Sequence, residues 1–263
     1  MIPTTNNRRR FYDKGVLISG GAGGIGRAAS LRFAEEGARL AIIDCDLEAG
    51  QSLAAGICEK GGKAAFFQAD VSNAQEIDTA IAESAKFLDN IDVLYNHAGT
   101  VVVSPFAETT DEEYDELMNI NVRSAFRVCR QVTRLMLGSN GGSIVISSSI
   151  CATRAFELES VYCMSKAALV MLAKCIATEY RHNNIRANAV CPAFVNTHHG
   201  LKEIEAFRGR GIDWNETSLK ELQVRMCDPD EIAQAVLFLA SDEAGFINGI
   251  DLHVDNGWSA HGG

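Results

Sequence analysis

Short apolar segments recur along the chain, and longer segments with the periodicity of an amphipathic helix separate them. Residues 250–254 add a last segment in which apolar and polar side chains alternate. The other apolar segments lie near residues 16, 40, 65, 92, 144 and 187. Strands that alternate with helices form a parallel sheet with helices on both faces. The pattern therefore predicts the α/β class, with a doubly wound parallel β-sheet.

Two of the predicted helices begin with clear capping signals. Thr110 and Glu113 are spaced as a capping box, in which each side chain satisfies a free backbone N–H group of the first turn. Asp228 is followed by Pro229, which fits an N-cap residue with proline in the first helical position. Both signals place a helix start within a residue or two.

A glycine-rich segment follows the first apolar segment. Residues 19–26 read Ser-Gly-Gly-Ala-Gly-Gly-Ile-Gly, and the helical pattern after them ends near Gly37. Glycines permit positive φ and let a pyrophosphate approach the backbone, while the N–H groups of the first helical turn face the anion. The next strand ends in Asp44, where an acidic residue is expected to accept hydrogen bonds from an adenosine ribose. These features together predict a nucleotide-binding site.

Tyr162 and Lys166 are spaced so that a helix places both on one face. A free tyrosine titrates near 10, so acid–base work at neutral pH needs a pKa lower by roughly 3 units, or about 4 kcal/mol. A lysine in a dry cleft beside a second positive charge can supply that difference. Three serines end the preceding strand, and the alternation of strand side chains turns Ser148 away from the face shared by Ser147 and Ser149.

Composition and charge narrow the functional class. The 263 residues are 47% hydrophobic and 22% charged, which is typical of one globular domain, expected over residues 14–263. A formal charge of −10 argues against nucleic-acid binding, which needs many cationic contacts. We find no apolar segment long enough to span a bilayer and no signal peptide, so no membrane association and a cytoplasmic location are expected. Residues 1–13, which include the arginines at 8–10, are expected to form a flexible tail.

The chain has eight cysteines, but no two are spaced as Cys-x-x-Cys. Cysteines in helical patterns, such as Cys129, Cys163 and Cys175, serve as small apolar side chains, so a reducing compartment fits best. The adjacent His198 and His199 are the only tempting metal ligands, and adjacent residues rarely chelate one ion. We therefore expect no metal.

With these residues in place, the chain resembles the short-chain dehydrogenase/reductase family over nearly its whole length. It departs from the family motifs at Ser19, where threonine is usual, at His97, where asparagine is usual, and at Ala193, where glycine is usual. The resemblance implies a single-domain Rossmann-type fold. The catalytic residues that it implies are Asn121, Ser149, Tyr162 and Lys166. The cofactor-binding residues that it implies are Ser19, Gly20, Gly24, Ile25, Gly26, Asp44, Asp70, Val71, Asn96, Ala98, Gly99, Tyr162, Lys166, Pro192, Val195 and Thr197.

The resemblance also implies a role for each catalytic residue. Lys166 would hold the nicotinamide ribose and lower the pKa of Tyr162, which would take the proton of a secondary alcohol. The family's spacing selects Ser149 among the serines, and its hydroxyl would bind the substrate oxygen. Asn121 would hold a water molecule that links Lys166 to solvent, or is simply a buried asparagine in a distorted helix.

Electrostatics favours NAD over NADP as the cofactor. A 2′-phosphate within ~4 Å of Asp44 would cost about 4 kcal/mol per unit charge at an effective dielectric constant near 20. Neither Gly23, in the glycine-rich segment, nor Cys45, after the acid, supplies a cation that would offset this cost. Because cells keep NAD mainly oxidised, this choice favours oxidation of the alcohol.

Residues 198–225 interrupt the alternation of strands and helices. One interpretation is a solvated loop held by a few buried anchors. In the family, the corresponding region is a mobile lid over the substrate, and its apolar residues would line an apolar pocket. We favour the lid. Its apolar residues, which are spaced for one or two short helices, are Leu201, Ile204, Phe207, Ile212 and Trp214.

We expect the substrate to be an uncharged secondary alcohol such as a hydroxysteroid, a cyclic diol or a polyol. Two alternatives remain open. An NADPH-dependent reductase of 3-oxoacyl groups would need a basic patch for an acidic carrier protein, and none is visible in the sequence. A catalytically silent NAD sensor would have a broken catalytic tetrad, and all four residues are present.

The helices that carry Asn121 and Tyr162 have apolar residues outside a single core-facing stripe. A helix that is apolar over much of its circumference is usually buried on two sides. In the family, the matching helices pack against their copies across a two-fold axis, so we expect a homotetramer with its main interface over residues 114–137 and 160–181. The additional apolar residues are Phe126, Val128, Leu135, Leu169, Met171, Leu172 and Ile176.

Overall fold

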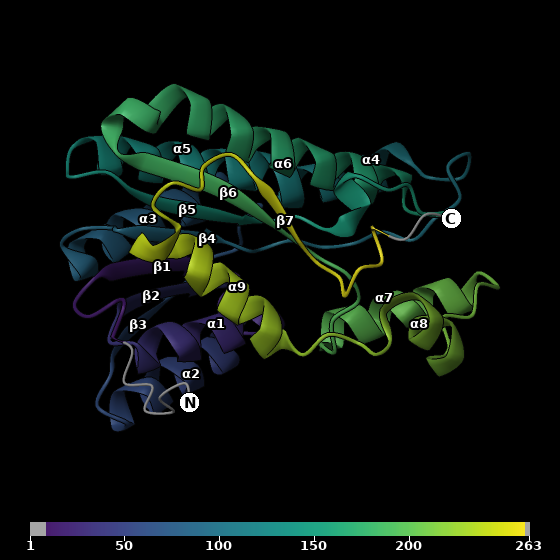
Figure 1. The fold of residues 1–263 in the computed structure, drawn as a ribbon, viewed down its shortest axis with the longest axis horizontal. Helices are drawn as coiled ribbons and strands as arrows, with labels where there is room; N and C mark the ends of the chain where they lie inside the picture. The colour runs from purple at the N-terminus through teal and green to yellow at the C-terminus, as the bar shows by residue number, and fades with distance from the viewer. Residues whose placement is uncertain (1–8, 261–263) are drawn as a thin grey trace.

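The computed structural model describes residues 9–260, in which seven parallel strands form one sheet in the order β3-β2-β1-β4-β5-β6-β7 (Figure 1). The strand order reverses between β1 and β4, so a crevice forms at the carboxyl ends of these two strands, where open parallel sheets bind ligands. The predicted doubly wound Rossmann-type fold is confirmed. The strands are β1 (Gly15–Ser19), β2 (Arg39–Asp44), β3 (Lys63–Gln68), β4 (Val93–Asn96), β5 (Gly142–Ser147), β6 (Ile185–Pro192) and β7 (Asp251–Val254).

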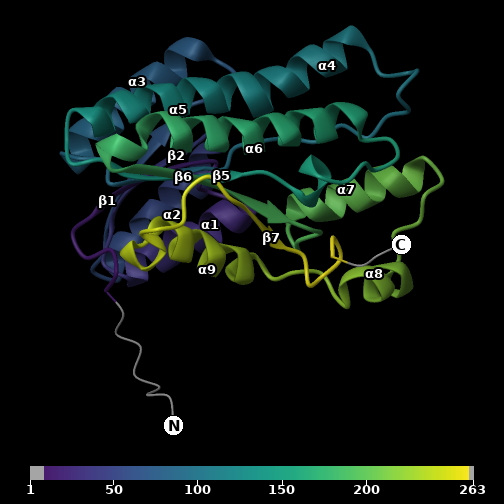
Figure 2. The ribbon, with the colours of Figure 1, turned by 45° about the horizontal axis from the view of Figure 1, so that its top comes forward.

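Helices cover both faces of the sheet (Figures 1 and 2). Alternate residues of β1 serve the two faces, since Leu17 packs into one buried apolar cluster and Val16 and Ile18 into the other. One face is covered by α3 (Ala74–Leu88), α5 (Ser124–Leu137) and α6 (Ser160–Tyr180). The other face is covered by α1 (Gly24–Glu35), α2 (Leu47–Glu59) and α9 (Pro229–Ala240).

Both predicted caps are present. Thr110 and Glu113 form the capping box of α4 (Asp111–Met118), and Asp228 caps α9 with Pro229 in the first turn. The irregular region beyond β6 forms two helices, α7 (His198–Gly209) and α8 (Glu216–Gln223), at the end of the sheet where the strands terminate (Figure 1).

The prediction of a flexible tail is wrong for residues 9–13. Phe11 is fully buried, with its ring centroid 4.7 Å from that of Phe33 on α1. Arg10 donates from Nε to Glu36 Oε2 at 2.7 Å. An apolar side chain and an ion pair thus fasten this segment to the end of α1. The rest of the predicted tail lies outside the described residues.

One segment, Ser160–Asn183, is long and apolar enough to cross a membrane by length and composition, although the sequence was expected to contain no such run. Half of its most apolar part is buried inside the protein, where Leu169 and Ala173 pack in the core between α6 and the sheet. The apolar character of α6 is therefore explained by its place as a core helix.

Some of the residues assigned to a subunit interface belong to the core instead. Val128, Leu169 and Ile176 are buried in the cluster that α5 and α6 form with the sheet. Phe126 and Met171 are exposed, as is Leu135. Both helices therefore have a core-facing side and also carry exposed apolar residues outside it.

Candidate active site

A cavity of about 560 Å³ opens at the carboxyl ends of the strands, between the loop after β1, the start of α6 and α7. The predicted site residues in its wall are Gly20, Gly24, Ile25, Asp44, Asp70, Val71, Ala98, Gly99, Ser149, Tyr162, Lys166, Pro192, Val195 and Thr197. The other predicted site residues lie behind the wall, and these are Ser19, Gly26, Asn96 and Asn121.

The conformation of the glycine-rich loop requires glycine at two positions, Gly20 and Gly26, where a side chain would clash with the backbone. Gly20 has φ +68°, and a Cβ there would lie 2.8 Å from the backbone nitrogen of Ala98. A Cβ on Gly26 would lie 1.9 Å from the carbonyl oxygen of Gly20. The N-cap of α1 is Gly23, whose lack of a side chain leaves the N–H groups of the first turn without a side-chain partner. A helix start of this kind can bind a phosphate.

Ser19 and Asn96 hold the two central strands together behind the loop. Ser19 Oγ donates to Asn96 Oδ1 at 3.1 Å and accepts from the backbone N–H of His97 at 3.2 Å. The two residues thus shape the loops that follow β1 and β4, and they do so without reaching the cavity.

Asp44 and Asp70 lie at the far end of the cavity from Tyr162 along the sheet. Asp44 accepts from the backbone N–H groups of Ala22 at 2.9 Å and Asp46 at 3.1 Å. Asp70 accepts from the N–H group of Ser72 at 2.8 Å. These bonds fix the orientation of both carboxylates and leave lone pairs free to accept hydrogen bonds from a ligand hydroxyl.

His97, which stands where the family has asparagine, joins a buried polar cluster. Its Nδ1 lies 2.8 Å from Ser147 Oγ and 3.2 Å from the hydroxyl of Tyr95, and its ring stacks on that of Tyr95. Burial, and then the charge of Lys166, lowers the pKa of His97 to about 3. The imidazole is therefore neutral and serves as a structural partner of the two hydroxyls.

Asn121 lies in a π-helical turn, Asn119–Arg123, between α4 and α5. Its Oδ1 accepts from the N–H group of Thr100 at 2.7 Å, and its Nδ2 donates to the carbonyl oxygen of Thr100 at 2.9 Å and to Ser165 Oγ at 3.0 Å. Both of its donors are thus used, and the side chain clamps the loop after β4 to α6. A Cβ on Gly99 would lie 3.2 Å from Asn121 and 3.5 Å from Lys166 Nζ, so the clamp lies beside the lysine.

The three serines at the end of β5 have different partners. Ser147 contacts Tyr95 and His97, and Ser148 Oγ donates to the carbonyl oxygen of Lys166 at 2.7 Å. Of the three, Ser149 hydrogen-bonds the Tyr162 side chain, and this bond favours the phenolate. The structure thus brings together the serine, tyrosine and lysine that the sequence selected.

The pKa of Tyr162 is raised well above its ordinary value, first by burial and then by the carboxyl of Glu203. This direction is opposite to the one that the catalytic role requires. Lys166 Nζ lies 5.3 Å from the centroid of the Tyr162 ring and donates to the carbonyl oxygen of Ser147 at 3.4 Å. Burial lowers the pKa of Lys166 to about 8. In the cofactor-free chain, the lysine alone does not offset the burial of the tyrosine.

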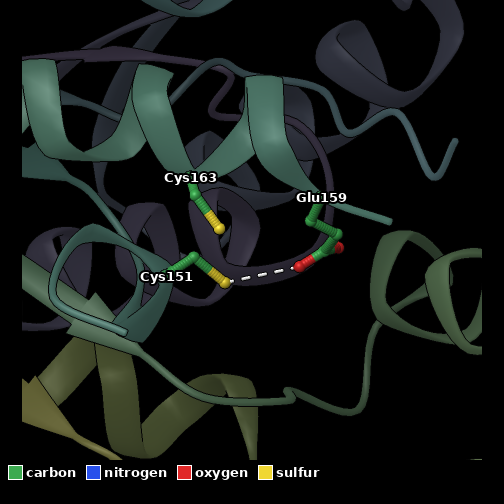
Figure 3. A group of neighbouring side chains, drawn as sticks. All are labelled: Cys151, Glu159 and Cys163. Carbon is green, nitrogen blue, oxygen red and sulfur yellow. Dashed lines mark hydrogen bonds between the residues drawn. The ribbon is translucent and has the colours of Figure 1, made fainter. Parts of the chain in front are cut away.

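Two neighbouring acids beside Tyr162, the buried Glu159 and the half-buried Glu203, were not found from the sequence. Figure 3 shows Glu159 with Cys151 and Cys163. Burial, and then the charge of Glu203, raises the pKa of Glu159 to about 10, and burial raises that of Glu203 to about 7. The Cys151 thiol donates to Glu159 Oε2 at 3.5 Å. A hydrogen bond with Cys151 lowers the pKa of Cys163 to about 6. The one available signal was Glu159, which precedes Tyr162 by three residues and so shares its face of α6.

The apolar part of the wall comes from aromatic residues outside the predicted lid. Phe156, Phe194 and Trp258 line the cavity, and the Trp258 ring centroid lies 5.4 Å from that of Phe156. The two rings meet edge to face. This cluster covers the side of the cavity opposite the glycine-rich loop.

The expectation that the apolar residues of the lid line the cavity is wrong. Leu201 is exposed, and Ile204 and Phe207 are buried in an apolar cluster beneath the cavity. His199 and Glu203 face the cavity instead. These two residues are one helical turn apart and share one side of α7, and Phe207 lies one further turn along that side, behind the cavity wall.

Comparison with known proteins agrees with this arrangement. A family model described as enoyl-(acyl carrier protein) reductase matches residues 20–259. D-threitol dehydrogenase of Mycolicibacterium smegmatis is 36% identical over 252 residues, which cover 95% of this chain and 94% of that protein. Cyclopentanol dehydrogenase of Comamonas testosteroni is 37% identical over 256 residues, which cover 96% and 99%. The structure of an NAD⁺-bound xylitol dehydrogenase superimposes with a TM-score of 0.89 at 28% identity and covers 94% of this chain and 99% of that one. The chain therefore belongs to the short-chain dehydrogenase/reductase family, and it is an oxidoreductase that acts on hydroxylated substrates.

Proposed function

We propose that this member of the short-chain dehydrogenase/reductase family is an NAD-dependent dehydrogenase of secondary alcohols. The observation that carries the proposal is the convergence of Ser149, Tyr162 and Lys166 in one cavity with the glycine-rich loop and Asp44. We call the part of the cavity formed by the glycine-rich loop, Asp44 and Asp70 the cofactor half. The alcohol half is the part formed by Ser149, Tyr162, Glu159, Glu203 and the aromatic residues.

The cofactor half fits NAD in three ways. Gly20 and Gly26 let the loop pack closely against the protein, and Gly23 and Gly24 give the cavity wall a stretch without side chains that a pyrophosphate can approach. The first turn of α1 has no acidic residue and no side-chain cap, so its N–H groups are suited to bind an anion. The carboxylate of Asp44 is held where it can accept from a ribose 2′-hydroxyl.

The same part of the wall disfavours NADP. Lys166 is the only lysine or arginine that the described residues place in the cavity wall, and it lies beside Tyr162 rather than beside Asp44. A 2′-phosphate near Asp44 would therefore meet a negative charge without a cation to offset it. NAD is the cofactor that this charge pattern supports, and alcohol oxidation is the direction that we propose.

The chain's own residues supply the proton chemistry. When bound, NAD supplies the carbon that accepts a hydride and a positive charge close to Tyr162. Tyr162 takes the hydroxyl proton of the alcohol, and Ser149 donates a hydrogen bond that holds the same oxygen. Lys166, whose Nζ lies 5.3 Å from the centroid of the Tyr162 ring, would stabilise the phenolate through its charge and would bind the nicotinamide ribose. Asn121 hydrogen-bonds both the loop that follows β4 and helix α6, and so holds these two segments together beside Lys166.

The alcohol half supports a substrate with an apolar body and more than one hydroxyl group. Phe156, Phe194 and Trp258 offer aromatic surface, while Glu159 and Glu203 offer carboxyl oxygens. We therefore propose a cyclic diol, a hydroxysteroid or a polyol. As a lid over this half, we propose residues 198–225, whose helix α7 contributes His199 and Glu203 to the wall.

The test is a screen of NAD reduction, followed by absorbance, across steroids, cyclic diols and sugar alcohols, with NADP in parallel. We expect at least one group of alcohols to be oxidised with NAD. A protein that binds NAD but oxidises no secondary alcohol would support the NAD sensor instead. Preference for NADPH with acyl-thioester ketones would support the 3-oxoacyl reductase.

We further propose that the exposed apolar side of α5 and α6 forms the main interface of a cytoplasmic homotetramer. Phe126 and Met171 are exposed there and line a groove between α4, α5 and α6. All eight cysteines are free thiols, as a reducing compartment requires. Light scattering at micromolar concentration tests the assembly, and an active monomer would exclude it.

A further inference from the structure

Two thiols and a carboxyl converge at the start of α6 (Figure 3). Cys163 lies in the first turn of α6, Glu159 immediately precedes the helix, and Cys151 lies in the short turn η2 (Ile150–Ala152). The three side chains point toward one another. The two Sγ atoms and a carboxyl oxygen of Glu159 all lie within 4.8 Å of one another. Among the described residues, no other group of cysteine, histidine and acidic side chains converges in this way.

The spacing of these atoms is close to that of a metal site. Zinc bonds of ~2.3 Å to sulfur and ~2.0–2.2 Å to oxygen place neighbouring ligands of a tetrahedral site roughly 3.5–3.8 Å apart. Cys151 Sγ already lies 3.5 Å from Glu159 Oε2. The remaining separations need to close by about 1 Å at most, which side-chain rotation can supply.

The carboxyl of Glu159 is short of partners. Its side chain is almost fully buried, and its Oε1 has no hydrogen-bond partner among the described residues. Glu159 and Cys151 lie in the wall of the cavity, as does Glu203, whereas Cys163 lies behind it. A cation at this point would therefore have three protein ligands and one side open to the cavity, which is the arrangement of zinc sites that exchange a ligand.

The chemistry of the ligands selects the kind of cation. Mg²⁺ and Ca²⁺ prefer oxygen ligands, whereas two sulfur atoms favour a softer ion such as Zn²⁺. An organic ammonium group would gain hydrogen bonds from Glu159 but little from the two thiols. The simpler interpretation of the cysteines as small apolar side chains leaves the buried carboxyl oxygen unexplained.

We propose that Cys151, Glu159 and Cys163 form a zinc-binding site that opens on the alcohol half of the cavity and inhibits the enzyme when occupied. Cys151 follows Ser149 by two residues, and Cys163 follows Tyr162 directly. A bound ion therefore lies among the groups that contact the alcohol oxygen. Its fourth ligand, a water molecule or Glu203, would fill space that the substrate needs. Zinc binding does not depend on the proposed function, whereas the inhibition does.

The binding arm uses the reduced, metal-free full chain without a histidine tag, titrated with Zn²⁺ alone by calorimetry. We expect one saturable site per chain. Because loss of an outer-sphere partner already costs 10–100-fold in affinity, Cys151→Ser and Cys163→Ser should each weaken binding by ~100-fold or more. The matched control is Cys58→Ser, an exposed thiol on α2, which should leave the affinity unchanged. Glu159→Gln, which retains the side-chain shape, is the second variant if a serine variant does not fold.

A spectroscopic arm identifies the ligands directly. Co²⁺ in place of Zn²⁺ should show the intense near-ultraviolet band of thiolate-to-cobalt charge transfer, and this band should vanish in Cys163→Ser. Absence of a saturable site in the wild-type chain would overturn the proposal. So would a Co²⁺ spectrum without the thiolate band, or equal weakening in the Cys58→Ser control.

The activity arm separates this inference from the proposed function. Zn²⁺ should remove most of the NAD-dependent turnover of the wild-type enzyme, EDTA should restore it, and Cys163→Ser should resist. Zinc that binds through the thiols without lowering turnover would overturn the inhibitory role. Thiol-dependent zinc binding by a protein that oxidises no alcohol would leave the metal site standing and remove the proposed function alone.

Discussion

Around the glycine-rich loop, Ser19 is paired with Asn96 and Asp44 accepts two backbone N–H groups, whereas near Tyr162 the buried acid Glu159 lies beside a second acid, Glu203. The cofactor half is thus held by partners within the chain. In the alcohol half, burial raises the pKa values of Glu159, Glu203 and Tyr162, and the charge of Glu203 raises those of Glu159 and Tyr162 further. The difference indicates that the cofactor half is preorganised before its ligand binds. In the alcohol half, the acidic groups gain suitable partners only when a ligand binds.

Tyr162→Phe tests the catalytic group where the two halves meet. We expect turnover to fall by roughly 10²–10⁴-fold while NAD binding stays within a factor of about two, because only the proton-transferring hydroxyl is lost. Initial rates and a fluorescence titration of NAD measure the two quantities. Tyr12→Phe, at an exposed tyrosine, is the matched control. Retention of more than a few per cent of activity would exclude Tyr162 as the acid–base group.

Asp44→Ala tests the charge of the cofactor half. We expect the ratio of kcat/KM for NADP to that for NAD to rise by ~100-fold, because repulsion of the 2′-phosphate and acceptance from the 2′-hydroxyl are lost together. Asp44→Asn separates the two effects, since the amide still accepts a hydrogen bond but has no charge. An unchanged ratio in both variants would refute the electrostatic explanation, as would a wild-type enzyme that prefers NADP.

Gly26→Ala tests how tightly the cofactor half is packed. Its Cβ would overlap the carbonyl oxygen of Gly20, so we expect Tm to fall by roughly 5 °C, together with a loss of NAD affinity. Gly56→Ala on α2, outside the cavity, is the control, because a Cβ there meets nothing within 4 Å. Calorimetry on the cofactor-free protein measures Tm, and titration with NAD measures the affinity. Equal Tm values for the two variants would show that the loop is not rigid.

Glu203→Gln tests the acids of the alcohol half. The folded chain raises the pKa of Glu203 to about 7 from an ordinary value of 4.5, so it binds more protons than the unfolded chain in this window. The stability linked to this proton is present below about pH 4.5 and is lost as pH rises through 7. The glutamine variant should therefore melt roughly 5 °C higher than wild type at pH 8 and nearly equally at pH 5. Glu205→Gln, at an exposed position of α7, should show no such difference between the two pH values.

The sequence predicted the cofactor half far better than the alcohol half. The backbone geometry of the loop allows only glycine at Gly20 and Gly26. Such a requirement produces a motif that can be recognised in the local sequence. The positions of all seven strands followed from their apolar segments for a similar reason. Strand alternation sets Ser148 apart from Ser147 and Ser149, and the spacing usual in the family favours Ser149 as the serine of the site.

The alcohol half could not be predicted because its contacts join distant segments. Cys151 and Cys163 are brought together by a turn whose geometry no local pattern records, and Glu203 comes from another helix. Ile204 and Phe207 of the lid were wrongly expected to line the cavity, but they are buried in an apolar cluster. Apolar periodicity predicts that one side of a helix is buried, but it does not show which part of the protein that side contacts. Phe11 was missed since a single aromatic residue among polar ones has no periodicity.

The most direct test of the proposed alcohol oxidation traces the hydrogen of the reacting carbon. The best alcohol from the screen is prepared with deuterium at its carbinol carbon and incubated with the enzyme and NAD, and the products are analysed by mass spectrometry. We expect the reduced NAD to carry the deuterium and ketone to form in equal amount. Ketone without deuterium in the cofactor, or labelled cofactor with NADP only, would contradict hydride transfer to NAD.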